Sequence, residues 1–315
     1  MRKYLLTPLV LSLCLSAPRA QDWVPVTLPT GDNITGIEFL HPDTGFLSIQ
    51  PGDLGRTYDG GRTWTIHPVA LDLALEDVSF ANAKLGLVCG KAGALYRTSD
   101  GGERWESVSP VGRDSTVAFF SVKFIDPRTA LVTGMSRHEE TPWSGIAYRS
   151  LDGGATWTRL EPMGLMYSEI FYSPTAGLVF PALGLLNRSD DKGKSWRQNG
   201  AIESALNRSV AVASDLIVLV GPKGFLAVSR DNGKTWKKIE QDVERTFVAV
   251  TAIDDRTVFV AGPNSLMLRS SDGGETWTQE LLARSFDVLD LARAGSRLYA
   301  VGTDGAVIYK ELGRK

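Results

Sequence analysis

The chain has 315 residues, of which 43% are hydrophobic and 22% charged, a composition typical of globular proteins. Its formal net charge is −2 with both signs interspersed, which argues against a nucleic acid or an anionic membrane surface as the partner. The 32 glycines and eight tryptophans indicate many tight turns and large packed aromatic side chains.

The first 20 residues have the pattern of a secretory signal peptide. A positively charged start precedes the apolar segment 5–15, and Ala20 ends a plausible cleavage site. The apolar segment is too short to span a bilayer comfortably. Cys14 lacks the small preceding residue of a lipoprotein signal, so we expect no lipid anchor. The sequence therefore predicts a periplasmic or secreted protein whose single domain is residues 21–315.

Residues 21–315 give little indication of a metal site, a cofactor site or a disulfide. Cys89 is its only cysteine, so an internal disulfide is excluded and we expect a buried strand residue. His41, His67 and His138 lie far apart without the spacing of metal ligands. No glycine-rich phosphate loop stands outside a predicted hairpin. We therefore predict neither a metal nor a cofactor.

Six segments repeat the pattern Ser/Thr-x-Asp-x-Gly, followed two residues later by a position that is usually Ser or Thr and then by Trp. The intervals between successive aspartates are 41, 52, 39, 40 and 41 residues. Glycine supplies the positive φ of a tight turn, and aspartate accepts hydrogen bonds from the turn amides. We interpret these boxes as structural turns and not as catalytic or calcium sites. Their aspartates are Asp59, Asp100, Asp152, Asp191, Asp231 and Asp272.

Short alternating strands fill the intervals between boxes, and no segment has a sustained helical period. The first strand of the repeat occurs seven times, although only six boxes are present. The N-terminal segment 22–28 resembles the strand after a box, with Trp23 in the tryptophan position. We therefore predict an all-β, seven-bladed β-propeller of four-stranded antiparallel blades, closed by the N-terminal strand. The first strands are predicted at 34–39, 77–80, 120–124, 170–172, 210–212, 247–250 and 288–291.

The boxes are Asp-box (BNR) repeats, which sialidases, sortilin-type receptors and some glucanases share. Their presence in nearly every blade, and the opening Trp23, Val26, Leu28 and Pro29, resemble the photosystem II stability/assembly factor family over about residues 22–310. This resemblance implies an exported, non-enzymatic scaffold without a cofactor that binds a protein partner, such as a membrane-protein precursor. We expect it to act as a monomer.

The alternative is a glycan-binding or glycoside-hydrolase propeller. The Phe-Arg-x-Pro motif of sialidases does not occur in the chain. Acidic residues of the first strands could nevertheless face the channel and act as a catalytic pair. Carboxylates at such positions are usually solvated channel linings, so we predict no enzyme. The acids concerned are Glu38, Glu76, Asp77, Glu169, Asp287 and Asp290.

Two features could bind a partner. The first is a basic residue directly before the box, which would form a ring around the rim and could bind carboxylates in bidentate fashion. Alternatively, each basic residue pairs with the aspartate of its own blade or lies on a solvated outer strand. The ring consists of Arg56, Arg97, Arg149, Arg188 and Arg269, with Lys310 in the last blade and Val228 as the exception.

The second feature is the insertion that makes one interval 52 residues long. Residues 134–145 occupy a connection that needs three or four residues elsewhere, so we predict a long loop on the face opposite the boxes. Trp143 is the only tryptophan outside the repeat and could be a recognition hot spot. His138 and Glu139 accompany it as candidate contacts.

Overall fold

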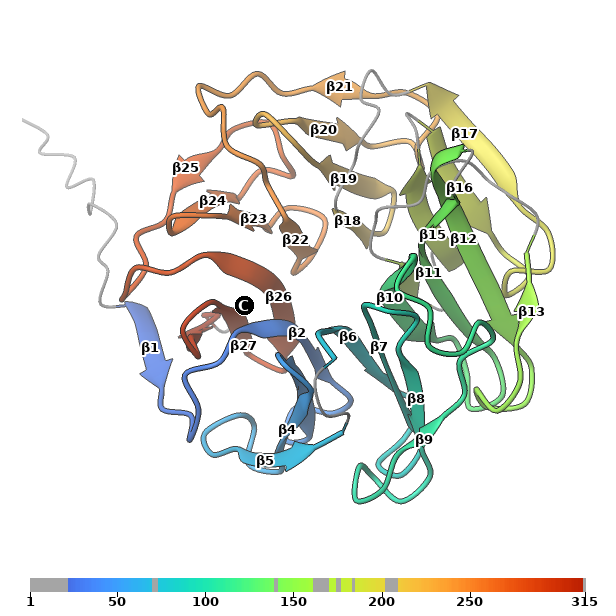
Figure 1. Ribbon diagram of the computed structural model, residues 1–315. Coiled ribbons are helices and arrows are strands. Elements are labelled where there is room, and N and C mark those ends of the chain that lie inside the picture. The colour runs from blue at the N-terminus through green and yellow to red at the C-terminus, as the bar shows by residue number, and fades with distance from the viewer. Residues whose placement is uncertain are drawn as a thin grey trace, which may run out of the picture.

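The computed structural model describes residues 22–69, 73–138, 141–160, 170–173, 177–182, 185–201 and 209–313. These residues form seven antiparallel sheets of four strands each, arranged as blades around a ring (Figure 1). The prediction of an all-β, seven-bladed propeller is therefore confirmed. The part of the chain that is described includes no helix that is long and apolar enough to cross a membrane.

Each of the first six blades uses four consecutive strands, counted from the channel outwards. Blade 1 contains β2 (Ile34–Phe39), β3 (Gly45–Ile49), β4 (Asp53–Thr57) and β5 (Thr65–Pro68). Blade 2 contains β6 (Leu75–Phe80), β7 (Gly86–Gly90), β8 (Leu95–Thr98) and β9 (Glu106–Ser107). Blade 3 contains β10 (Val117–Phe124), β11 (Ala130–His138), β12 (Thr141–Ser150) and β13 (Thr158–Arg159).

The next three blades follow the same order. Blade 4 contains β14 (Phe171–Ser173), β15 (Gly177–Ala182), β16 (Leu185–Ser189) and β17 (Arg197–Ala201). Blade 5 contains β18 (Ser209–Ala213), β19 (Leu216–Val220), β20 (Leu226–Ser229) and β21 (Lys237–Lys238). Blade 6 contains β22 (Ala249–Ala252), β23 (Val258–Gly262), β24 (Leu266–Ser270) and β25 (Thr278–Gln279).

Blade 7 joins the two ends of the chain. Its inner strands are β26 (Val288–Ala294), β27 (Arg297–Gly302) and β28 (Val307–Glu311). The outer strand is β1 (Trp23–Val26), which pairs antiparallel with β28 from Trp23 opposite Lys310 to Val26 opposite Val307. Figure 1 shows β1 in blue beside the red C-terminal blade. The predicted closure by the N-terminal strand is confirmed, and it leaves no open gap between the first and last blades.

The hydrophobic core lies between neighbouring blades. Every residue of β7, including Cys89, is buried, because the second strand of a blade is covered on both faces. The rings of Phe46 and Phe80, from blades 1 and 2, stack with their centroids 3.5 Å apart. Each box tryptophan packs into such an interface; Trp64, for example, joins the cluster that Tyr299 of blade 7 contributes to. Packing of sheet on sheet therefore sets the geometry of the ring.

The insertion in blade 3, which we predicted as a long loop, extends the β-hairpin between the second and third strands. β11 and β12 remain paired out to His138 opposite Thr141. Pairing satisfies backbone amides and carbonyls that a loop would leave to solvent, which explains the difference. The hairpin joins the second and third strands and the box joins the third and fourth, so the two lie on opposite faces as expected. Glu139 and the side chains of His138 and Trp143 fall outside the described residues.

Candidate functional site at the Asp-box rim and the channel

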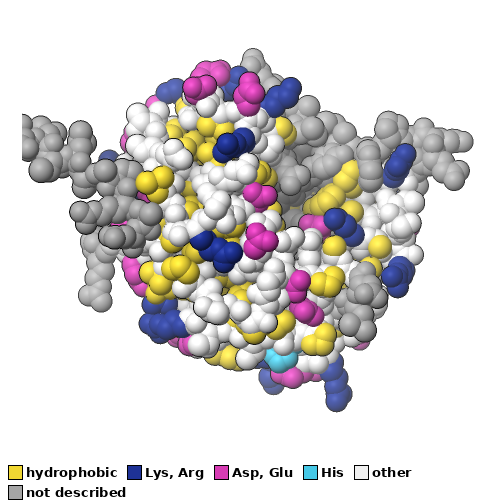
Figure 2. Space-filling view, turned by 60° about the vertical axis from the view of Figure 1, so that its left-hand side comes forward, with side chains coloured by type: hydrophobic (Ala, Val, Ile, Leu, Met, Phe, Trp, Pro, Cys, Tyr) yellow, Lys and Arg dark blue, Asp and Glu magenta, His cyan; other side chains and the backbone are white. Residues whose placement is uncertain are grey.

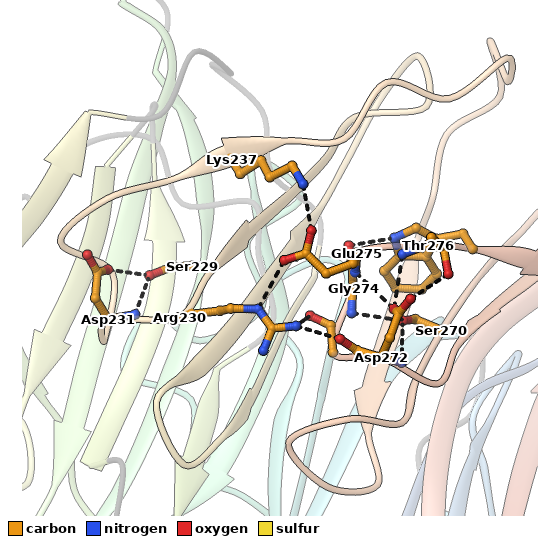
Figure 3. A network of polar contacts seen from close by, with 11 residues as sticks. Ser229, Arg230, Asp231, Lys237, Ser270, Asp272, Gly274, Glu275 and Thr276 are labelled. Atoms are coloured by element: carbon orange, nitrogen blue, oxygen red, sulfur yellow. Dashed lines mark hydrogen bonds and ion pairs between the residues drawn. The ribbon is translucent and has the colours of Figure 1, made fainter.

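Each box is a turn organised by one carboxylate. In blade 6, Ser270 Oγ and the Thr276 amide donate to Asp272 Oδ1 over 2.7 and 3.0 Å, and Thr276 Oγ1 donates to Oδ2 over 2.5 Å (Figure 3). The Gly274 amide donates to Ser270 Oγ, and its carbonyl accepts from Trp277 Nε1 at 3.2 Å. The aspartate is thus committed to its own turn, as the sequence predicts.

The hydrogen bonds hold the box aspartates in the ionised form. The Thr235 hydroxyl, followed by the Thr235 amide and the Ser229 hydroxyl, lowers the pKa of Asp231 to about 2. The same donors in blade 6, led by the Thr276 hydroxyl, lower the pKa of Asp272. A carboxylate with so low a pKa is a poor proton donor or acceptor at neutral pH. These aspartates are therefore structural.

The second glycine of the box is the contact point between blades. A Cβ at Gly154 would lie 2.8 Å from Leu87 Cδ2 of the preceding blade, and one at Gly274 would lie 2.8 Å from Val228. The preceding box position also has positive φ but accommodates Lys192 and Asn232, both at 61°. The second position is glycine in all six boxes, and in five of them a Cβ would come within 3.0 Å of a side chain of the preceding blade.

Two ring arginines reach from their own blade to the box of the next. Arg97 Nε donates to the carbonyl of Gly153 over 2.9 Å, and its Nη1 lies 2.8 Å from Glu106 Oε1. Arg188 Nη1 donates to Asn232 Oδ1 over 2.9 Å, and its Nε lies 3.1 Å from Asp190 Oδ1. These two arginines therefore link neighbouring blades in addition to pairing with an acid of their own blade.

The other ring arginines have looser contacts. Arg56 stacks 4.4 Å above the Tyr58 ring, and its Nη1 lies 3.6 Å from Glu103 of blade 2. Arg269 Nη1 lies 3.7 Å from Glu280, and 41% of its side chain is exposed, compared with 14% for Arg56. Arg149 has a buried Nη1 without a hydrogen-bond partner. Partner binding by this ring stays a prediction.

Blade 5, where Val228 interrupts the ring, obtains the same linkage from a residue that the sequence analysis missed. Arg230 Nη2 donates to the carbonyls of Asp272 and Gly273 over 2.6 and 2.7 Å, and its Nε lies 3.4 Å from Glu275 (Figure 3). Lys237 Nζ joins the same carboxylate at 2.6 Å. The sequence does contain a signal for this contact, because Arg230 lies inside the box, two residues after Val228.

Blade 7 also departs from the predicted ring. Tyr309, and not Lys310, occupies the ring position, because it lies opposite Tyr299, which faces blade 1. Lys310 points towards blade 6, where its Nζ lies 2.8 Å from Glu280 Oε2. Arg297 replaces the missing arginine: its guanidinium lies 4.8 Å from the Tyr309 ring, and its Nη1 donates to the carbonyl of Gly60 over 3.2 Å. The prediction for Lys310 was wrong by one residue.

Three of the six predicted channel acids line the central cavity, which has a volume of about 230 Å³ and residues from all seven blades. They are Glu38, Asp77 and Asp290. The other two described acids lie off the channel: Glu76 pairs with Lys91 at 3.6 Å, and Asp287 accepts the Asn264 amide at 2.7 Å. The sixth acid, Glu169, falls outside the described residues.

The channel carboxylates join the inner strands into a belt. Asp290 accepts the Ile37 amide of blade 1 at 2.8 Å, and Asp77 accepts the Val122 amide of blade 3 at 2.9 Å. Glu38 accepts the Phe80 amide of blade 2 at 2.6 Å and pairs with Lys123 of blade 3. Each carboxylate thus accepts a main-chain amide of a neighbouring blade, an arrangement that stabilises the ring.

Within the described ranges, no three His, Cys, Asp or Glu side chains come together as a group that could hold a metal ion. On the face in Figure 2, basic and acidic side chains are scattered among uncharged ones, and no large area carries a single sign.

Fold and rim together define a seven-bladed Asp-box (BNR) β-propeller. In a comparison with protein families, the model described as photosynthesis system II assembly factor YCF48 matches residues 15–160, and the BNR/Asp-box repeat model matches residues 227–238. The chain thus resembles the photosystem II assembly factor-like propellers, as the sequence indicates. The comparison with curated proteins gives no match.

Two solved structures of YCF48 are similar to this chain over nearly its whole length. The structure titled YCF48 bound to D1 peptide has a TM-score of 0.72 and 21% identity, and the match covers 93% of this chain and 97% of the other. YCF48 from Cyanidioschyzon merolae has the same TM-score and identity, with 92% and 99% covered. An ancestral GH74 enzyme has a TM-score of 0.68 at 10% identity, covering 90% of this chain and 45% of the enzyme. At these identities the likeness shows the fold alone.

Proposed function

We propose that this protein is an exported, non-enzymatic scaffold that binds a segment of a partner polypeptide during assembly, in the manner of a photosystem II assembly factor. The partner we favour is the precursor of a membrane protein. The observation that carries the proposal is the match, over 93% of the chain, to a YCF48 structure with a bound D1 peptide. The family-model match over residues 15–160 supports the same role independently.

The channel chemistry supports a binding role over hydrolysis. A retaining or inverting glycosidase needs two carboxyl groups on opposite sides of a sugar, one of them free to donate a proton. Here Glu38, Asp77 and Asp290 accept backbone amides of neighbouring blades. The likeness to the GH74 enzyme extends to the fold and gives no residue-level support for glycan chemistry.

Export is part of the proposal and rests on residues 1–20. Their charged start, apolar centre and small-residue end fit a signal that is removed after translocation. We expect a tagged full-length chain to accumulate outside the cytoplasm in a shortened form that begins near Gln21. Cell fractionation with N-terminal sequencing of the purified protein tests this. Full-length protein in the cytoplasm would contradict it.

The binding role is tested with short overlapping peptides. They should cover the extramembrane segments of D1 and of the membrane proteins of the source organism's envelope. We expect a small set to bind the purified protein with a saturable affinity in the micromolar range, about 10⁻⁶ M, measured by isothermal calorimetry. A glycoside panel is assayed in parallel. Hydrolysis that disappears in an Asp290→Asn variant, together with no peptide binding, would overturn the proposal.

A further inference from the structure

A hollow lies between blades 6 and 7. Its volume is about 390 Å³, and its walls include Ile253 of blade 6, Arg293 and Ser296 of blade 7, and Leu312 near the end of the chain. Apolar side chains and a cation thus meet in one concave site. Arg293 also lines the central channel, so it stands where the two cavities adjoin.

Main-chain carbonyls fix the guanidinium of Arg293. Its Nε donates to the carbonyl of Gly295 over 2.9 Å, and its Nη1 donates to the carbonyl of Ile253 over 2.8 Å. The side chain is exposed and forms no ion pair within the described part of the chain. A guanidinium has five N–H donors, so Nη2 and one hydrogen of Nη1 remain available. The group is thereby held in place before any ligand arrives.

We propose that Arg293 is a carboxylate-binding residue for the partner polypeptide, with the hollow between blades 6 and 7 receiving the adjoining apolar side chain. The inference rests on the proposed function and names the chemistry that its partner must carry. A planar guanidinium with free donors matches a carboxylate, and charge complementarity selects that group. Because the arginine is already oriented, little side-chain entropy is lost on binding.

Asp254 places a negative charge beside Arg293 in the same hollow. It lines the same hollow, and its Oδ1 accepts the amides of Arg256 and Thr257 over 2.9 and 2.7 Å. Its negative charge opposes an incoming carboxylate, so affinity depends on the approach from the Arg293 side. Replacing Asp254 by Asn should therefore strengthen binding, an effect opposite in sign to that of losing Arg293.

The test uses the peptides that bind the full chain. Arg293→Gln should weaken their binding by about tenfold or more, Arg293→Lys should have an intermediate effect, and Asp254→Asn should tighten binding. Arg284→Gln is the matched control, because Arg284 also donates to a backbone carbonyl, that of Asp304, but does not line the hollow. If all variants unfold at the same temperature as the wild type, the changes in affinity come from the binding site and not from a loss of fold.

Modified peptides distinguish the two sources of the carboxylate. If a C-terminal carboxylate binds, amidation of the peptide should reproduce the loss; if a side chain binds, Asp→Asn or Glu→Gln changes should do so. Unchanged affinity in Arg293→Gln, with the wild-type protein still binding peptides, overturns this inference and leaves the proposed function intact. No binding to the wild-type protein overturns both.

Discussion

At the scale of single residues, the Asp box distinguishes two glycine positions with different tolerance. The first is buried where it is glycine, as at Gly153, yet two boxes place Lys192 and Asn232 there at positive φ. The second lies against a side chain of the preceding blade, as Gly154 does against Leu87. A repeat that looks uniform in the sequence therefore contains one position that defines a turn and another that defines how closely two blades approach.

We expect Gly154→Ala to lower the free energy of unfolding by about 2 kcal/mol or more, because it adds both backbone strain and a clash with Leu87. Urea denaturation followed by tryptophan fluorescence measures the loss. Lys192→Gly is the control, since it keeps a residue at positive φ without new packing. Equal effects of the two variants would show that packing between blades does not distinguish the positions.

The box of blade 2 is incomplete, because Arg104 stands where the other boxes have Ser or Thr. The Arg104 amide, followed by the Thr98 hydroxyl, lowers the pKa of Asp100, but no hydroxyl donates to its second oxygen. We expect Arg104→Thr to move the pKa of Asp100 towards the value of about 2 that Asp231 has. Carbon-13 NMR titration of the carboxyl group checks this. A pKa that stays the same would mean that the hydroxyl contributes nothing to the turn.

At the scale of elements, the inner strands are joined by acids that look alike in the sequence and act differently. Asp290 binds the Ile37 amide across the junction of blades 7 and 1, whereas Glu76 makes an exposed pair with Lys91. We expect Asp290→Ala to cost about 1–3 kcal/mol, because it leaves a main-chain donor without its partner. Glu76→Ala should cost less than about 1 kcal/mol. Chemical denaturation measures the free energy of unfolding of both variants. A larger loss of stability in Glu76→Ala than in Asp290→Ala would contradict the role of the channel carboxylates in joining the inner strands.

The repeats predict the blades well because each one carries its own turn, glycine and tryptophan. Prediction weakens where that signal ends. Blade 7 has no box from which its strands could be aligned with those of the other blades. The sequence therefore places Lys310 in the ring position that Tyr309 occupies in the structure. The contacts between blades, such as Arg230 with the next box, depend on the packing of one sheet on another, and no local pattern encodes that distance. The insertion was recognisable from its length, but its pairing as a hairpin was not.

At the scale of the whole molecule, the boxes form a ring of carboxylates whose ionised state supports the fold. Hydrogen bonds from Ser195 and Ser189 and from nearby amides lower the pKa of Asp191, and donors of the same kind act in the other boxes. A pKa that is lower in the folded than in the unfolded state adds stability above the unfolded value of 3.8. That stability is lost as the pH falls through the folded value, which is about 2 for Asp231.

We therefore expect the urea midpoint to stay high above about pH 4 and to fall steeply between about pH 4 and 2. Denaturation curves measured across that range test this prediction. An Asp231→Asn variant should be less stable than the wild type at pH 7, and the difference should shrink towards pH 2. A midpoint that does not change with pH in this window would show that the boxes contribute no net charge-dependent stability.

The pairing of β1 with β28 also determines the order in which the protein can be completed during synthesis. β1 is among the first parts of the domain to leave the ribosome, and its partner residues Val307–Lys310 are among the last. Six blades can collapse one after another, but the N-terminal strand must stay unpaired until the last strand of the domain has been made. Until the two strands pair, β28 presents a free edge that another chain could occupy. Ring closure consequently cannot precede the synthesis of β28, and a nascent chain that stalls before that strand is complete is the form most exposed to wrong pairing.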